Sequence, residues 1–145
     1  MTRQLRSRVF ASALYGLLAL QAAVVVAQTP APAASPAVAV TDTPEYKRGR
    51  LLFIQCRACH EVKAGMPAKV GPSLHGLIGA KSAHVEGFTY SAALRAANLT
   101  WDRATLDRWL ERPSAVVPGN SMAFAGVANP KDRAALLTYL EVETR

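Results

Sequence analysis

The residue types best suited to chemistry lie together in the pentapeptide Cys56-Arg57-Ala58-Cys59-His60. This C-x-x-C-H spacing is typical of covalent attachment of a c-type haem. Each of the two thiols can add to one vinyl group of the porphyrin, and the adjacent imidazole is then held beside the ring, where it can ligate iron. The motif therefore predicts one haem c, bound through Cys56 and Cys59, with His60 as an axial ligand.

Two cysteines at this spacing also occur in thioredoxin-like redox pairs, in zinc sites and in simple disulfides. A redox pair of that kind requires a β-α-β surrounding, which the following sequence does not provide. A zinc site needs four ligands, and the chain has only two cysteines. A disulfide would leave His60 unexplained. We therefore favour haem attachment, which requires an export signal and benefits from a second iron ligand elsewhere in the chain.

The N-terminus has the composition of a secretory signal peptide. Three arginines precede an almost wholly apolar run from Val9 to Val26, and small residues allow cleavage after Ala27. The alternative is an uncleaved anchor, because the run is just long enough to span a bilayer. We expect a signal peptide over residues 1–27 and a periplasmic protein, which suits a haem that is attached after export.

Residues 28–43 are rich in alanine, proline, serine and threonine and are expected to form a flexible tether. The remaining segment, residues 44–145, is expected to form one small domain, to which a porphyrin would add apolar volume. Loss of the three N-terminal arginines leaves 14 basic against 10 acidic residues, a net charge of +4. This mild charge does not indicate binding to nucleic acid.

The pattern of the domain predicts helices and no strands. We expect a helix from Pro44 to about Cys56 with Thr43 as its cap, because proline at the first position and a preceding threonine favour a helix start. Residues 61–79 are rich in glycine and proline and should form a loop. Further helices are expected over residues 90–97, over residues 101–110 with Thr100 as cap, and from Pro130 with Asn129 as cap.

A second axial ligand could come from Met66, His75, His84 or Met122. Met66 is too close to the C-x-x-C-H motif to reach the opposite haem face, and the two histidines lie in glycine-flanked loops where surface histidines are common. Met122 lies some sixty residues beyond the motif, in an irregular loop. It could instead fill a gap in the core, but we favour Met122 as the ligand.

With these segments in place, the chain resembles class I c-type cytochromes of the mitochondrial and bacterial periplasmic type. The resemblance covers nearly everything from Pro44 onward. It rests on Gly49 and Phe53 before the C-x-x-C-H motif, Gly71-Pro72-Ser73-Leu74-His75-Gly76-Leu77, Gly87-Phe88-Thr89-Tyr90-Ser91, Leu99-Thr100-Trp101, Pro118-Gly119-Asn120-Ser121-Met122-Ala123-Phe124, and Leu136-x-x-Tyr139-Leu140.

The resemblance implies the small all-α cytochrome c fold, with short helices around one haem and the first and last helices crossing at Gly49 and Tyr139. It implies that His60 and Met122 ligate iron and that the Pro72 carbonyl accepts a hydrogen bond from His60.

The resemblance also implies that Tyr90 and Trp101 bind a haem propionate and that Trp109 lies beside the methionine ligand. Plain core packing is the alternative for these three aromatics. The chain departs from many relatives at Ala80, where they have arginine, and at Leu94, where they often have asparagine.

We therefore expect a monomeric one-electron carrier and not an enzyme. Its partners would be redox proteins such as a quinol–cytochrome c reductase, a terminal oxidase or a periplasmic dehydrogenase, and it would meet a membrane only if the N-terminal segment is uncleaved. One alternative is a dedicated cytochrome subunit or acceptor of one dehydrogenase, and another is a haem peroxidase or ligand sensor. Neutral residues replace several haem-edge lysines of mitochondrial relatives, which predicts apolar docking; they are Ser114, Ala115, Ser121, Ala128 and Asn129.

Overall fold

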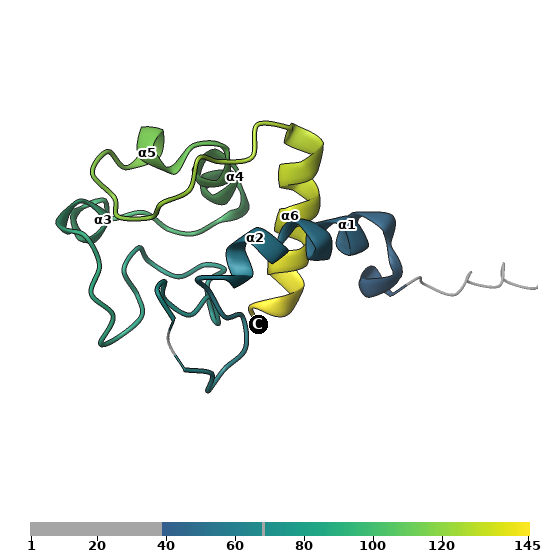
Figure 1. Cartoon of the computed structure of the whole chain (residues 1–145), viewed down its shortest axis with the longest axis horizontal. Coiled ribbons are helices and arrows are strands. Elements are labelled where there is room, and N and C mark those ends of the chain that lie inside the picture. Colours follow the sequence, from purple (N-terminus) through teal and green to yellow (C-terminus); the bar gives the residue numbers. More distant parts are fainter. Residues whose placement is uncertain (1–38, 68) are drawn as a thin grey trace, which may run out of the picture. The chain divides into compact units, whose positions relative to one another are not determined.

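Short helices and long loops make up the computed structural model, which describes residues 39–67 and 69–145 (Figure 1). The expected signal peptide and most of the expected tether lie outside the described residues. The elements in order are η1 (Val40–Asp42), α1 (Pro44–Leu52), α2 (Ile54–Arg57), α3 (Ala92–Ala96), α4 (Arg103–Glu111), α5 (Pro113–Val116) and α6 (Pro130–Glu143). Within the described part of the chain there is no strand, so the all-α prediction is confirmed.

Helix α1 begins as the sequence predicts. The hydroxyl of Thr43 accepts a hydrogen bond from the amide of Tyr46 at 3.2 Å, and proline occupies the first position of the helix. The expected continuous helix to Cys56 is wrong, because the chain makes a turn at Phe53 before α2 begins. Phe53 is 3% exposed and its ring lies 5.1 Å from that of Tyr139, so the turn coincides with a buried aromatic contact.

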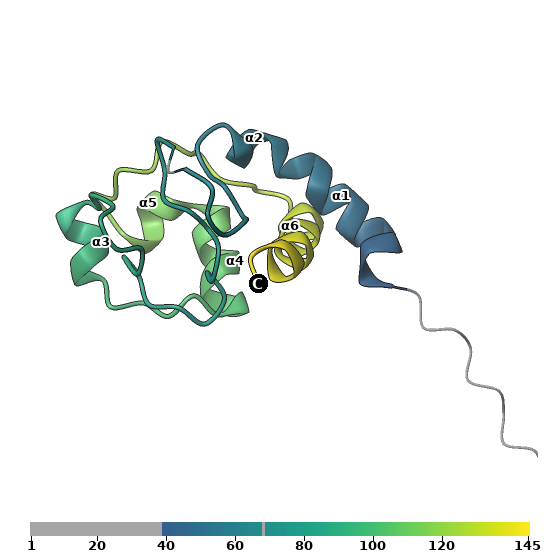
Figure 2. The same ribbon diagram turned by 90° about the horizontal axis from the view of Figure 1, so that it is seen from below.

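Helices α1 and α6 cross at close range, as Figures 1 and 2 show. A Cβ atom at Gly49 would lie 2.1 Å from the carbonyl oxygen of Ala135 and 2.8 Å from Cβ of Tyr139. Only glycine permits this approach. The hydroxyl of Tyr46 donates to Glu143 at 2.5 Å, and this bond, with burial, raises the pKa of Tyr46 to about 12. The predicted crossing at Gly49 and Tyr139 is thereby confirmed.

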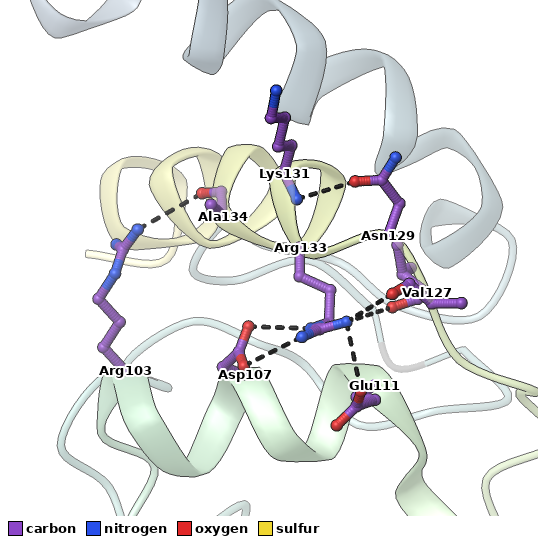
Figure 3. A network of polar contacts seen from close by, with 9 residues as sticks. Arg103, Asp107, Glu111, Val127, Asn129, Lys131, Arg133 and Ala134 are labelled. Carbon is purple, nitrogen blue, oxygen red and sulfur yellow. Dashed lines mark hydrogen bonds and ion pairs between the residues drawn. The ribbon is translucent and has the colours of Figure 1, made fainter.

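The start of α6 is fastened to α4 through Arg133 (Figure 3). This side chain is 9% exposed, and its Nε pairs with Asp107 at 3.0 Å. Its Nη1 donates to the carbonyls of Val127 and Ala128 at 3.1 and 2.9 Å. The same Nη1 lies 3.6 Å from a carboxylate oxygen of Glu111. The guanidinium thus ties the segment before α6 to both helices.

The middle of the domain differs in detail from the sequence prediction. Thr100 does not cap α4; it is paired with Lys81 in an isolated antiparallel bridge. Asp102 is the cap instead, accepting from the amide of Thr105 at 2.7 Å. Helix α3 is shorter than predicted and begins after Ser91, whose hydroxyl accepts from Leu94. Helix α5 was not predicted. No helix in the described ranges is long and apolar enough to cross a membrane.

Candidate haem site

Two adjoining cavities open between the loops and the helices. Their combined lining of hydrophobic and aromatic side chains with a few polar groups is typical of cofactor sites. Both are lined by Cys56, His60, Pro72 and Met122, so they form one continuous slot. The structure brings all eight sequence-predicted site residues to this slot; the other four are Cys59, Tyr90, Trp101 and Trp109.

His60 enters the slot from the turn that follows α2. Its Nδ1 lies 2.8 Å from the carbonyl oxygen of Pro72 and donates to it, because a carbonyl can only accept. That bond leaves Nε2 as the ring nitrogen with a free lone pair, the usual arrangement for a metal-ligating histidine. A Cβ at Gly71 would lie 2.5 Å from Cε1 of the ring. The glycine therefore lets the backbone lie flat against the imidazole and fix its orientation.

The two cysteines are free thiols on the wall beside His60. Burial, with a smaller contribution from Cys59, raises the pKa of Cys56 to about 11. A thioredoxin-like pair depends on a lowered thiol pKa, so this environment does not suit that alternative. The described residues also contain no group of three or more histidine, cysteine, aspartate or glutamate side chains that could hold a metal ion directly.

Met122 reaches the slot from the loop between α5 and α6. The side-chain oxygen of Asn120 accepts from the amide of Met122 at 3.0 Å, and its Nδ2 donates to the carbonyl of Val117 at 2.8 Å. These two bonds fix the turn that carries the thioether. By contrast, Met66 is 49% exposed and does not line the slot, and His75 is also exposed.

Tyr90, Trp101 and Trp109 line the same one of the two cavities, which we call the inner cavity. The rings of Trp101 and Trp109 meet edge to face with centroids 5.2 Å apart, and both are buried. The hydroxyl oxygen of Tyr90 accepts from the amide of Val85 at 3.3 Å, so its own proton remains available to donate. Burial raises the pKa of Tyr90, which keeps the phenol protonated at neutral pH.

His84 is the residue that sequence reasoning misplaced. It was expected at the surface, yet it lines the inner cavity. Both of its ring nitrogens are buried and lack a hydrogen-bond partner among the described residues. No local signal in the sequence could have revealed this, because the loop is held by contacts with residues 99–101.

Comparison with known proteins gives consistent results. The chain is 45% identical over 102 residues to cytochrome c of Cochliobolus lunatus, covering 70% of this chain and 94% of the relative. It is 44% identical over 96 residues to cytochrome c2 of Rhodomicrobium vannielii, covering 66% and 77%. This chain belongs to the class I c-type cytochromes. No family model matches it. Among solved structures, cytochrome cH from Methylobacterium extorquens has 38% sequence identity and a TM-score of 0.62, covering 66% of this chain and 96% of that one.

As a member of this family, the cytochrome is a small electron carrier and not an enzyme, and it binds one covalent haem c. Its slot fits that group on structural grounds. The slot is lined mainly by apolar side chains, as a porphyrin requires, with two thiols at one wall and an oriented imidazole beside them. The buried, unpartnered nitrogens of His84 mark a place where a polar group of the cofactor is needed.

Proposed function

We propose that the cytochrome transfers single electrons between redox proteins in the periplasm, with His60 and Met122 as the axial ligands of its haem iron. The observation that carries the proposal is that these two side chains, from segments sixty residues apart, line the same slot. Cys56 and Cys59 would hold the haem covalently. Bound haem supplies an iron that changes its charge by one electron.

The protein would tune and protect that change. A thioether is neutral and soft, so ligation by Met122 favours ferrous iron and raises the reduction potential. The hydrogen bond from His60 to Pro72 holds the imidazole in one orientation and one tautomer. The apolar wall, which includes Leu74, Leu94 and Leu106, would disfavour water beside the haem. Tyr90 and Trp101 are proposed to donate to a haem propionate.

The rim of the slot supports docking through apolar contact. Val70 is 83% exposed at the opening beside Cys59, and the rings of Phe88 and Phe124 line the same opening. Lys69, which precedes Val70 in the chain, is paired with Glu61 at 2.5 Å. The partner would be a quinol–cytochrome c reductase or a terminal oxidase. If the protein serves as the dedicated acceptor of one dehydrogenase, the two should co-purify in fixed stoichiometry.

The cytochrome would reach the periplasm through a signal peptide over residues 1–27, followed by a tether to about residue 43 and the domain from residue 44 onward. The described part of the chain already includes η1 within the tether range. N-terminal sequencing of the exported protein distinguishes cleavage after Ala27 from retention of an anchor. A mature chain that begins at Met1 would refute the proposed cleavage.

The ligand assignment is tested by paired methionine substitutions in the holo-protein. Ferric haem with a methionine ligand has a near-infrared iron–sulfur charge-transfer band. Met122→Ala should abolish that band and lower the potential while the covalent haem is retained. Met66→Ala, at an exposed site outside the slot, is the matched control and should change neither. If the control loses the band and Met122→Ala keeps it, the assignment is wrong.

A further inference from the structure

The two ring nitrogens of His84 are buried polar atoms without a partner. Its Nδ1 and Nε2 are both shielded from solvent, and neither has a hydrogen-bond partner in the described part of the chain. Buried polar atoms in folded proteins are almost always hydrogen-bonded, and the exceptions call for an explanation. Because His84 lines the inner cavity, the group that fills this cavity can supply the missing hydrogen-bond partner.

The loop that carries His84 is held on both sides of the residue. On one side, the amide of Ser82 donates to the carbonyl of Leu99 at 2.8 Å, and the amide of Leu99 donates to the hydroxyl of Ser82 at 3.1 Å. On the other side, the amide of Val85 donates to Tyr90 at 3.3 Å. Between them, Ala83 has a φ of +59°, a left-handed conformation that is uncommon for alanine. The surrounding bonds therefore impose a backbone conformation that places His84 against the cavity.

The other charged and titratable groups near His84 are engaged elsewhere or exposed. Of the described residues that line the cavity, only His60 and His84 can carry a positive charge. His60 is engaged with the Pro72 carbonyl. Tyr90 is neutral and can donate a proton. The nearby ions on the same loop and on α3 point elsewhere: Lys81 donates to Thr100, Arg95 to the carbonyl of Tyr90, and Glu86 is exposed.

We propose that His84 donates a hydrogen bond to a haem propionate and makes the reduction potential depend on pH. The proposal rests on the placement of haem by His60 and Met122 proposed above. With iron bound by those two residues, the carboxylates are the polar groups of haem that remain to be satisfied. A carboxylate and a protonated imidazole form a charge-assisted hydrogen bond. His84 and Tyr90, which face one cavity, would then hold the same edge of the cofactor.

The pH dependence follows from the charge of the iron. Histidine is the side chain that ordinarily changes its charge between about pH 5 and 8. Oxidation adds one positive charge to the haem, and a positive charge on nearby His84 opposes it. Protonation of His84 therefore favours the ferrous state. The potential should rise as pH falls, and His84 should release its proton at a lower pH in the ferric protein than in the ferrous one.

The test uses the holo-protein and three variants. His84→Gln keeps a donor that cannot titrate, His84→Leu removes the donor, and His75→Gln alters the exposed histidine as a control. The potential of the wild type and of His75→Gln should rise across pH 8 to 5, and this rise should be lost in both His84 variants. Resonance Raman spectra should show a shifted propionate bending band in His84→Leu but not in the control.

A second measurement needs no variant. In wild-type protein with ¹⁵N-labelled histidine, the ring signals of His84 should titrate at different pH in the two oxidation states, whereas those of His75 should not. A potential that is independent of pH, a pH profile unchanged in both His84 variants, or a His84 titration unaffected by oxidation would overturn the proposal. If the wild type shows the iron–sulfur band, such a result refutes only the role of His84; absence of the band refutes the ligation by Met122.

Discussion

Substitution of Gly49 by alanine sets two opposing effects against each other at the crossing of α1 and α6. In a helix interior, alanine is favoured over glycine by about 1 kcal/mol. The new Cβ, however, would lie 2.1 Å from the carbonyl oxygen of Ala135 and 2.7 Å from its carbon. These are backbone atoms of α6, which cannot rotate away as a flexible side chain could. The two helices would have to move apart.

The cost of such overpacking is about 1 to 3 kcal/mol, and contact with rigid backbone places this site at the upper end. Subtracting the gain in helix propensity leaves a net loss of about 2 kcal/mol in the free energy of unfolding. With a urea m-value of roughly 2 kcal/mol/M, the unfolding midpoint should fall by about 1 M. The assay is urea unfolding of the holo-protein, followed by circular dichroism and by haem absorbance.

Lys47→Ala is the control, because Lys47 is an exposed residue of the same helix. Its effect should stay within about 0.5 kcal/mol, as is usual for surface positions. If Gly49→Ala proves as stable as the wild type or more so, helix propensity dominates and the close crossing does not limit the fold. That result would refute the reasoning.

Three further predictions concern other parts of the molecule. Backbone N–H donation from Thr105 lowers the pKa of Asp102. The capping contribution of Asp102 to stability is therefore present above the unfolded-state pKa of about 3.9 and is lost as pH falls through the pKa in the folded state. Asp102→Asn should make the urea midpoint less sensitive to acid, and an unchanged acid profile would contradict this. Arg133→Lys should lower the thermal unfolding midpoint, because lysine cannot bind Asp107 and the two backbone carbonyls at once as the guanidinium does. An unaltered midpoint would show that these contacts do not stabilise the fold. Cys56→Ser with Cys59→Ser should yield little compact protein, and cooperative unfolding of a haem-free double variant would disprove the coupling of haem and fold.

Local features of the sequence predicted the helices with strong end signals. Thr43 before Pro44 and Asn129 before Pro130 both cap helices, and in each case the side-chain oxygen accepts an amide hydrogen bond. These predictions succeed because the cap, the proline and the first turn are neighbours in the chain. The C-x-x-C-H motif is equally local, since its chemistry depends on five consecutive residues.

The errors arose where distant segments determine the structure. Thr100 has the residue type of a cap, but its pairing with Lys81 takes it out of the helix start, and Asp102 takes the role. His84 has the sequence surroundings of a surface loop residue. The burial of its ring nitrogens depends on a loop held by bonds between Ser82 and Leu99, which no periodicity within the loop can reveal.

The contact between α1 and α6 has a consequence for the order in which the chain can fold. Among the described residues these are the first and last α-helices, so their contact encloses the other α-helices found there. Closing so long a loop costs conformational entropy before the contact between α1 and α6 contributes any stabilising free energy. The chain is made from its N-terminus, and Cys56, Cys59 and His60 therefore emerge well before α6 exists. During that interval the haem-binding segment lacks the partner of α1 and remains accessible, and the arrival of the final helix completes the domain around it.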